Sequence, residues 1–320
     1  MTQFSRREFV KKSTLTTMGL GLALKSQSQS SPDKAGEAVF KISLAQWSLN
    51  PLIFSGKMDN LDFAKGAREH GIDAIEYVNQ FFMDKAQDQA YLREMKSRAD
   101  GEGVRSLLIM CDREGSLGDP DAAKRKQTVE NHKKWVEASK YLGCHSIRVN
   151  GYTKDWSEDP KEFKETMDLV ADGLAQLCRF ADGFDINVII ENHGGWSSDA
   201  KWLVGVMKKA DHARAGTLPD FGNFGISRKG DKQISYDSYK GVEELMPFAK
   251  GVSVKPNVLD DKGNRGDLDY VRMMKIVLDA GYRGYCGIEH GPKGSEWEGI
   301  MEVKKQLLTA RDELSGMYGS

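Results

Sequence analysis

The chain lacks several features that mark whole classes of function. Its 320 residues contain no apolar run of about 18 residues or more, the length that a membrane-spanning helix needs. The formal net charge is -1, which argues against the strongly basic surface that non-specific nucleic-acid binding requires. No glycine-rich phosphate loop occurs, neither G-x-G-x-x-G nor a P-loop. We therefore expect no nucleic-acid partner and no organic cofactor.

Cysteine and histidine are also scarce. There is no C-x-x-C pair, and each of the four cysteines lies in or beside an apolar segment: Cys111, Cys144, Cys178 and Cys286. We interpret them as small buried apolar residues, with one disulfide left open as an alternative. Only six histidines are present, and His70, His132 and His212 lie on or beside expected helices. That leaves too few nitrogen ligands for the multi-metal site of a nuclease.

The first residues have the character of an export signal. A charged start, Ser5-Arg6-Arg7-Glu8-Phe9-Val10-Lys11, is followed by a weakly apolar run and then by a polar tract over residues 26–31. This order is typical of secretory signals, and the arginine pair indicates the twin-arginine type. We predict a signal and polar tract over residues 1–31, a folded domain over 32–320, export to the periplasm, and no membrane contact once the signal is removed. A basic amphipathic tail is the alternative.

From residue 41 onward, short aliphatic segments alternate with longer charged segments of helical periodicity. Glycines end the expected helices, for example Gly71 after 61–70 and Gly101 after 91–100. Parallel strands need a crossover between them, so the alternation predicts a parallel sheet. Eight such units indicate an α/β fold, a single-domain (β/α)₈ TIM barrel. The expected strands are 41–47, 72–78, 104–110, 145–150, 186–191, 215–220, 251–255 and 285–289.

Catalytic groups of such barrels lie at the carboxyl ends of the strands. Glu191, Asp220 and Glu289 end the fifth, sixth and eighth expected strands, so they should crowd together. Like charges at close range stay ionised only beside a cation. Oxygen ligands suit Mg²⁺ or Mn²⁺, and an added imidazole from His193 shifts the preference toward Mn²⁺, Co²⁺ or Zn²⁺. The alternative is a charge network in which the carboxylates pair with Arg148 and Lys255.

Three segments carry a resemblance to a known family: "VIIENHGG", "GTLPDFGNFG" and "LDYVRMMKIVLDAGYRGYCGIEH". Over residues 40–315 the chain resembles the xylose isomerase-like barrel superfamily, the sugar isomerase/epimerase group. The resemblance implies a divalent cation bound by Glu191, Asp220 and Glu289. The chain departs from the family at two positions that the family fills with histidine: Asn223 after strand six and Ser253 on strand seven. His193, Asn223 or a water could complete the ligand set.

The function expected on this basis is a divalent-metal isomerase or epimerase of an unphosphorylated keto sugar or related polyol, acting through an enediolate. The resemblance implies that Glu191 and Glu289 serve as the acid/base pair, and Lys255 is a candidate for stabilising the oxyanion. One alternative is a lyase or dehydratase on a keto sugar or keto-glycoside, and another is a sugar-binding barrel without catalysis. The expected partner is a small carbohydrate, and the sequence leaves a homo-oligomer open.

Substrate contacts are expected from side chains at other strand ends. Trp47 would present a ring face to the sugar, although plain barrel packing is the alternative for this residue. Arg148 would bind sugar hydroxyls unless it only neutralises Glu76. The full expected set of substrate-binding residues is Trp47, Glu76, Arg148, Asn150, His193 and Asn223.

Overall fold

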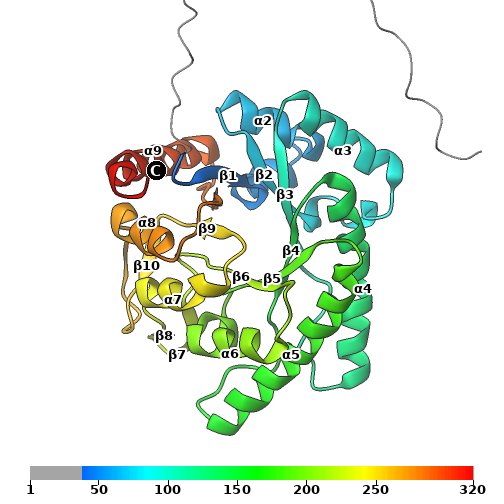
Figure 1. Ribbon diagram of the computed structural model, residues 1–320, viewed down its shortest axis with the longest axis vertical. Coiled ribbons are helices and arrows are strands. Elements are labelled where there is room, and N and C mark those ends of the chain that lie inside the picture. Colours follow the sequence, from blue (N-terminus) through cyan, green and yellow to red (C-terminus); the bar gives the residue numbers. More distant parts are fainter. Residues whose placement is uncertain (1–37, 320) are drawn as a thin grey trace, which may run out of the picture. The chain divides into compact units, whose positions relative to one another are not determined.

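A ring of parallel strands surrounded by helices forms the body of the protein (Figure 1). The structure is a computed structural model that describes residues 38–319, so the predicted signal lies outside the described residues. The eight-stranded sheet has the order β6-β5-β4-β3-β2-β1-β12-β9, and every pair in it is parallel. Its strands are β1 (Lys41–Ala45), β2 (Ala74–Val78), β3 (Arg105–Met110), β4 (Ser146–Asn150), β5 (Asn187–Glu191), β6 (Ala215–Leu218), β9 (Val252–Val254) and β12 (Tyr285–Ile288).

The barrel closes between β6 and β9 through two isolated parallel bridges, Thr217 to Ala249 and Asp220 to Ser253. The backbone N–H of Ser253 donates to the carbonyl of Pro219 at 2.9 Å. Strand β6 ends just before this proline, which has no N–H to continue a ladder. The closed (β/α)₈ architecture predicted from the alternation is confirmed.

Each strand of the barrel leads into an outer helix. Helices α3 to α8 each begin after an aspartate whose carboxylate accepts a backbone N–H of the first turn, which satisfies donors that have no partner within the helix. The helices are α1 (Asn50–Phe54), α2 (Phe63–Glu69), α3 (Gln89–Gly101), α4 (Ala122–Leu142), α5 (Pro160–Asp182), α6 (Ala200–Ala210), α7 (Ser238–Leu245), α8 (Tyr270–Asp279) and α9 (Glu296–Tyr318). Within residues 38–319, no helix has both the length and the apolar character to cross a bilayer.

Two apolar regions hold the layers together. The larger fills the space between sheet and helices, and it contains the four cysteines. All four are free thiols and buried, as the sequence predicted. The smaller region lies inside the barrel, where alternate side chains of the strands meet. Its members are Ala45, Val78, Leu108, Met110, Ile189 and Leu218.

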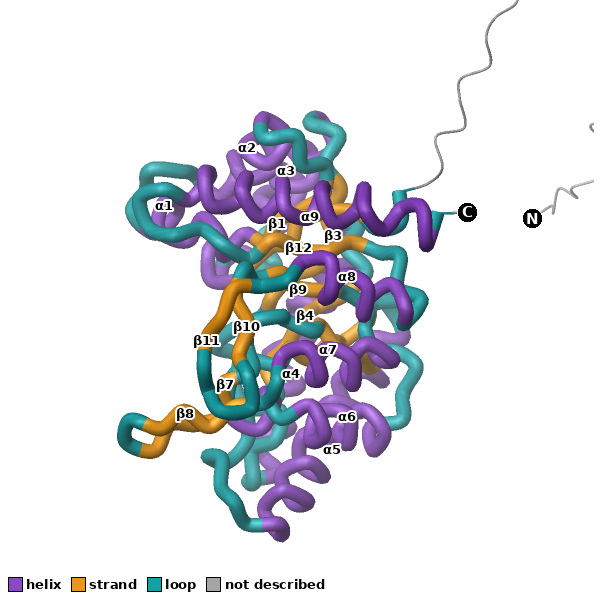
Figure 2. The backbone as a smooth tube through the Cα atoms, turned by 90° about the vertical axis from the view of Figure 1, so that its left-hand side faces the viewer, coloured by secondary structure: helices purple, strands orange, loops and turns teal. Residues whose placement is uncertain are grey.

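The structure departs from a plain strand–helix repeat in two places. A hairpin of β7 (Gly225–Lys229) and β8 (Lys232–Ser235) follows β6, and a second hairpin of β10 (Asn257–Leu259) and β11 (Arg265–Asp267) follows β9. Figure 2 shows both on the same side of the barrel. One helix end also differs from the prediction: Gly101 is still helical, and Gly103 has the positive φ of 64° that ends the turn.

Candidate active site

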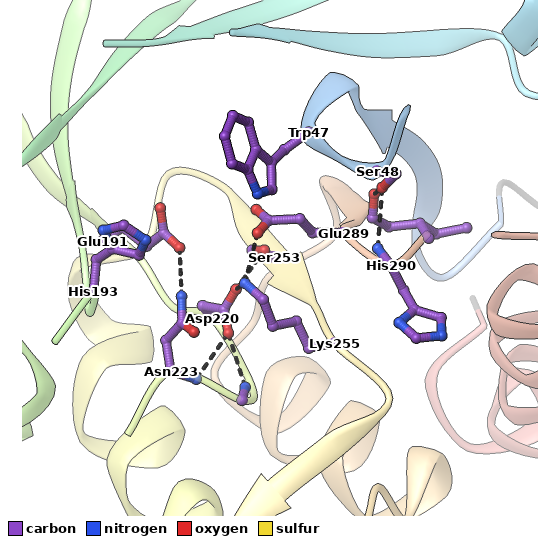
Figure 3. A network of polar contacts seen from close by, with 12 residues as sticks. Trp47, Ser48, Glu191, His193, Asp220, Asn223, Ser253, Lys255, Glu289 and His290 are labelled. Atoms are coloured by element: carbon purple, nitrogen blue, oxygen red, sulfur yellow. Dashed lines mark hydrogen bonds and ion pairs between the residues drawn. The ribbon is translucent and has the colours of Figure 1, made fainter. Parts of the chain in front are cut away.

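The polar side chains stand directly above the apolar layer inside the barrel. Side chains two residues apart on a strand share a face, so Glu191 follows Ile189 and Asp220 follows Leu218 toward the carboxyl end. The same alternation places Glu289 beyond Gly287. Strands from distant parts of the chain thereby deliver three carboxylates to one point, as Figure 3 shows.

Glu191, Asp220 and Glu289 form a cluster that could hold a metal ion. Each offers one carboxylate oxygen, and these oxygens all lie within 4.8 Å of one another. The Oε2 atom of Glu191 is buried and has no hydrogen-bond partner among the described residues. An oxygen-only donor set with one unsatisfied carboxylate oxygen fits a hard divalent cation such as Mg²⁺ or Mn²⁺. The gathering of these three side chains is the arrangement that the sequence predicted.

Lys255 lies between two of the three carboxylates. Its Nζ donates to Asp220 Oδ2 at 2.5 Å and to Glu289 Oε1 at 2.7 Å. Burial alone would lower the pKa of Lys255, but Asp220 and Glu289 raise it above its ordinary value. For Glu289 the effects are opposite: burial alone would raise its pKa, but Lys255 lowers the pKa below its ordinary value. The ammonium is therefore a fixed positive charge within the cluster.

Ser253, which stands where the family has histidine, also faces the cluster. Its hydroxyl donates to Asp220 Oδ2 at 2.8 Å, while Asp220 Oδ1 accepts the backbone N–H groups of Gly222 and Asn223. Both oxygens of Asp220 are thus occupied by donors. A cation bound to Asp220 would take the place of one of them.

Arg148 is the second positive charge, and it is buried. Its Nη1 donates to Asp112 Oδ1 at 2.8 Å, and its Nε lies 3.0 Å from Glu191 Oε2 without forming a hydrogen bond. Burial raises the pKa of Glu191 more than Arg148 lowers it. For Asp112, the contacts of Arg148 outweigh burial and hold the pKa well below its usual range. With Asp112 included, four carboxylates face two cations, which leaves two negative charges for a divalent ion to balance.

The predicted charge network is therefore present together with the carboxylate cluster. The pairing of Arg148 is with Asp112 and Glu191, and no hydrogen bond or ion pair joins it to Glu76 in the described chain. Asn150 also donates to Asp112 Oδ1, at 2.9 Å. Asn223 donates to Glu191 Oε1 at 2.9 Å, which orients this carboxylate.

His193 lies beside the cluster but is not a member of it. Its Nδ1 is 3.2 Å from the hydroxyl of Tyr152, and the ring lines a cleft of about 330 Å³ together with Trp47 and Glu289. A metal-ligand role for His193 stays a prediction. Trp47 lines this cleft and a second one of about 330 Å³ on the Lys255 side, which is the position expected for a ring that contacts substrate.

Glu76 lies below the site, inside the barrel, and lines none of these clefts. It is 2 % exposed and accepts a hydrogen bond from Ser43 at 2.7 Å. A Cβ at Gly287 would stand 2.4 Å from Glu76 Oε1, so only glycine leaves room for this carboxyl. Burial raises the pKa of Glu76 to about 7. The predicted direct contact of Glu76 with substrate has no support in this position, because the side chain is enclosed.

The sequence analysis did not select two residues that contribute to the site. Asp112 follows β3 by two residues and pairs with Arg148, and the same rule that found Glu191 would have found it. Asn192 left no signal, because its side chain acts on backbone: it donates to the carbonyl of Asp220 at 2.9 Å and accepts the N–H of Asp220 at 2.8 Å. It fixes the ends of β5 and β6 against each other.

Removing the ammonium of Lys255 should make the protein depend on an added cation. In the presence of a chelator, Lys255→Gln leaves Asp220 and Glu289 without their shared partner, so we expect the free energy of unfolding to fall by about 3–5 kcal/mol. Mn²⁺ should stabilise the variant more than the wild type, because the ion replaces the lost charge. Chemical denaturation with and without Mn²⁺ measures both effects.

The control for this variant is Lys275→Gln. Lys275 pairs with Asp279 on the exposed surface, where the loss of an ion pair costs about 1 kcal/mol or less. Absence of any stabilisation of Lys255→Gln by Mn²⁺ would contradict cation binding at these carboxylates.

The buried Glu76 should make stability depend on pH. Because folding raises its pKa to about 7, the native protein keeps a proton that the unfolded chain releases above about pH 4.5. The free energy of unfolding therefore falls as pH rises through this window. Glu76→Gln removes the cost of burying an ionised carboxylate. We therefore expect the free energy of unfolding to rise by about 3 kcal/mol at pH 8 and to change little at pH 5. Denaturation with chelator at both pH values measures it, with the exposed-site variant Glu137→Gln as control; a pH-independent difference would refute the assignment.

Several solved structures share this fold. The structure is similar to a 3-keto-D-glucoside 4-epimerase from E. coli (15% identity, 85% of this chain and 99% of that chain, TM-score 0.62). It is similar to a xylose isomerase-like TIM barrel protein from Mycobacterium smegmatis in complex with magnesium (16% identity, 86% of this chain and 98% of that chain, TM-score 0.63). A probable 3-DHS dehydratase from Bacillus anthracis is similar as well (16% identity, 84% of this chain and 99% of that chain, TM-score 0.62).

Sequence identities this low show the fold alone; other similar structures include D-psicose 3-epimerases. No curated protein matches the chain by sequence. A family model does match, over residues 64–308, which is well over half of the chain. The chain thus belongs to the xylose isomerase-like TIM barrel family.

Proposed function

We propose that the protein is an isomerase or epimerase of an unphosphorylated keto sugar or related polyol that depends on a divalent metal. The observation that carries the proposal is the placement of Glu191 and Glu289 around one point, with the Lys255 ammonium against Glu289. An acid/base pair and a fixed positive charge at one carbon centre are what an enolisation requires. The epimerases among the similar structures support this reaction class.

Glu191, Asp220 and Glu289 would hold the cation, and a bound divalent ion would polarise the carbonyl and the adjacent hydroxyl of the sugar. The protein's own residues supply the remaining steps. Burial raises the pKa of Glu191, which favours its protonated form and suits the group that returns a proton. Lys255 lowers the pKa of Glu289, so this carboxylate is the one of the two that stays unprotonated and can accept a proton. Assigning Glu289 to proton removal and Glu191 to proton return is part of this proposal.

The remaining residues of the site would orient the sugar and stabilise charge. Lys255 would stabilise the negative oxygen of the enediolate, since its ammonium is fixed by two carboxylates and needs no reorganisation. Asn150 and His193 line the cleft with Trp47, whose ring packs against Phe81 with centroids 6.0 Å apart. This packing would hold the indole face steady against the sugar ring.

A lyase or dehydratase reaction is the second candidate, because it begins with the same proton removal. The dehydratase among the similar structures favours keeping it. The two reactions differ only in whether the enediolate is reprotonated or expels a neighbouring group.

Turnover in deuterated buffer tests both candidates. We expect the protein with Mn²⁺ to incorporate deuterium beside the carbonyl of a keto sugar and to produce its epimer or isomer, in a panel of D-fructose, D-tagatose and 3-keto-glucosides followed by NMR. Glu191→Gln and Glu289→Gln should each lower kcat by about 10²–10⁴, because each removes a proton-transfer group. Chelator should abolish the reaction, and the surface variant Glu302→Gln should retain it.

Each other outcome has a defined meaning. Release of water or of an aglycone would replace the isomerase assignment by the lyase. Tight sugar binding by the parent and by Glu289→Gln, without any deuterium exchange, would establish a binding protein and refute both enzymatic candidates.

We also propose that the protein is exported through the twin-arginine signal of residues 1–31, on the strength of the sequence Ser5–Lys11. Replacing Arg6 and Arg7 by lysine should retain the protein in the cytoplasm, whereas replacing Lys12, which lies outside this stretch, by glutamine should not. Cell fractionation with an antibody to the barrel measures this. Equal export of the two variants would refute the proposal.

A further inference from the structure

A third cleft, distinct from the two that surround the carboxylates, opens between the two hairpins. It measures about 490 Å³ and is larger than either of the clefts at the carboxylates. Figure 2 shows the hairpins that form it, β7–β8 and β10–β11, on the same side of the barrel. The residues that line it are His193, Gly194, Gly222, Asn223, Gly225, Arg228, Gln233, Leu259, Gly263 and Arg265.

This cleft adjoins the candidate active site. His193 lines both this cleft and the one beside Glu289, and Asn223 lines it while donating to Glu191 Oε1. Arg265 lines it and also the cleft beside Lys255. A molecule with one unit at the carboxylates could therefore place a second unit in this adjoining cleft.

The lining of this cleft is positively charged. Two guanidinium groups, those of Arg228 and Arg265, face no carboxylate among the lining residues. Arg265 donates to the side chain of Asn257 at 2.7 Å, and the Arg228 side chain has neither a hydrogen bond nor an ion pair within residues 38–319. Arginine forks match the planar geometry of carboxylate and the oxygens of phosphate. The cleft therefore suits an anion better than a neutral sugar.

Glycines shape the space between the two hairpins. Gly194 and Gly263 have positive φ values of 83° and 86°, which side-chain-bearing residues rarely adopt. A Cβ at Gly263 would stand 2.7 Å from the side chain of Gln233, on the facing hairpin. The two hairpins thus approach each other closely at Gly263, and the space between them stays open toward the arginines.

We propose that this cleft is a second subsite that binds an anionic substituent, a carboxylate or a phosphate ester, carried by a second unit of the substrate. The proposal rests on the proposed function, because it places the first unit at the carboxylate cluster. It narrows the substrate class from a free keto sugar to a two-unit glycoside with negative charge on the unit remote from the reacting carbon. Loops after the barrel strands are where such enzymes vary their substrates.

Calorimetric binding to the metal-loaded protein tests the subsite without requiring turnover. The probes are neutral cellobiose, cellobiouronic acid and cellobiose 6'-phosphate. We expect an acidic probe to bind about tenfold more tightly than cellobiose at low salt, the effect of one or two charge-assisted hydrogen bonds. The preference should shrink at about 0.5 M NaCl, because exposed charges are screened. The two acidic probes show which anion the arginines prefer.

The double variant Arg228→Gln/Arg265→Gln should lose the preference and keep its affinity for cellobiose. Lys232→Gln, on the same hairpin but outside the lining, removes one charge and should keep the preference. Failure of both acidic probes to bind better than cellobiose, or an undiminished preference in the double variant, would overturn the proposal.

The outcome is separable from that of the proposed function. Turnover of a neutral keto sugar without an anion preference would leave the function standing and remove the subsite. An arginine-dependent anion preference in a protein without turnover would support the subsite and refute the proposed function.

Discussion

Carboxylates withdrawn from water stay charged only beside positive charge, and the centre of this barrel depends on that constraint. Asp220 and Glu191 have almost no solvent exposure. Lys255 serves two carboxylates and Arg148 serves two, so neither cation can be lost without leaving an uncompensated buried charge. Rigid strand ends below and backbone donors around Asp220 hold the groups at fixed separations. With both cations in place, the carboxylates still keep a surplus of negative charge that a divalent ion would balance.

Closure of the barrel and construction of the site use the same residues. Strands β6 and β9 are joined by isolated bridges instead of a continuous ladder, and one bridge pairs Asp220 with Ser253. The Ser253 hydroxyl, the Lys255 ammonium and the Asn192 amide all bond to Asp220. Polar side chains thus supply part of the cohesion that backbone pairing supplies elsewhere in the sheet. Ser253 contributes a hydrogen-bond donor to this carboxylate.

The sequence predicted the parts of the structure that follow from periodicity. Aliphatic runs predicted all eight barrel strands, and the convergence of their carboxyl ends predicted that Glu191, Asp220 and Glu289 lie together. Periodicity does not report where a long flexible side chain ends, so the bridging position of Lys255 required the structure. It also does not separate a buried end such as Glu76 from an accessible one. The sequence around a buried strand-end residue resembles that around an accessible one. Only the packing of the neighbouring strands determines whether the side chain is enclosed.

The hairpins were missed for a related reason. Their strands are short, three to five residues, and β11 is exposed along its length, so no alternation of apolar and polar residues marks them. Asp112 was missed although its signal was present, since it lies two residues after the barrel-interior residue Met110, as Asp220 does after Leu218. Backbone-directed residues such as Asn192 have no sequence signature of their own.

The pairing of the first strand with the last sets the order in which the molecule can be assembled. Strand β1 hydrogen-bonds to β12 from Lys41 with Tyr285 to Leu44 with Ile288, so one of its edges remains open until the ribosome has delivered almost the whole chain. Contacts this far apart in sequence close slowly, because a long loop must be ordered first. Glu289 follows β12 directly and arrives with it. A nascent chain therefore holds two of its three clustered acids well before the third, and any ion captured during translation meets an incomplete cage.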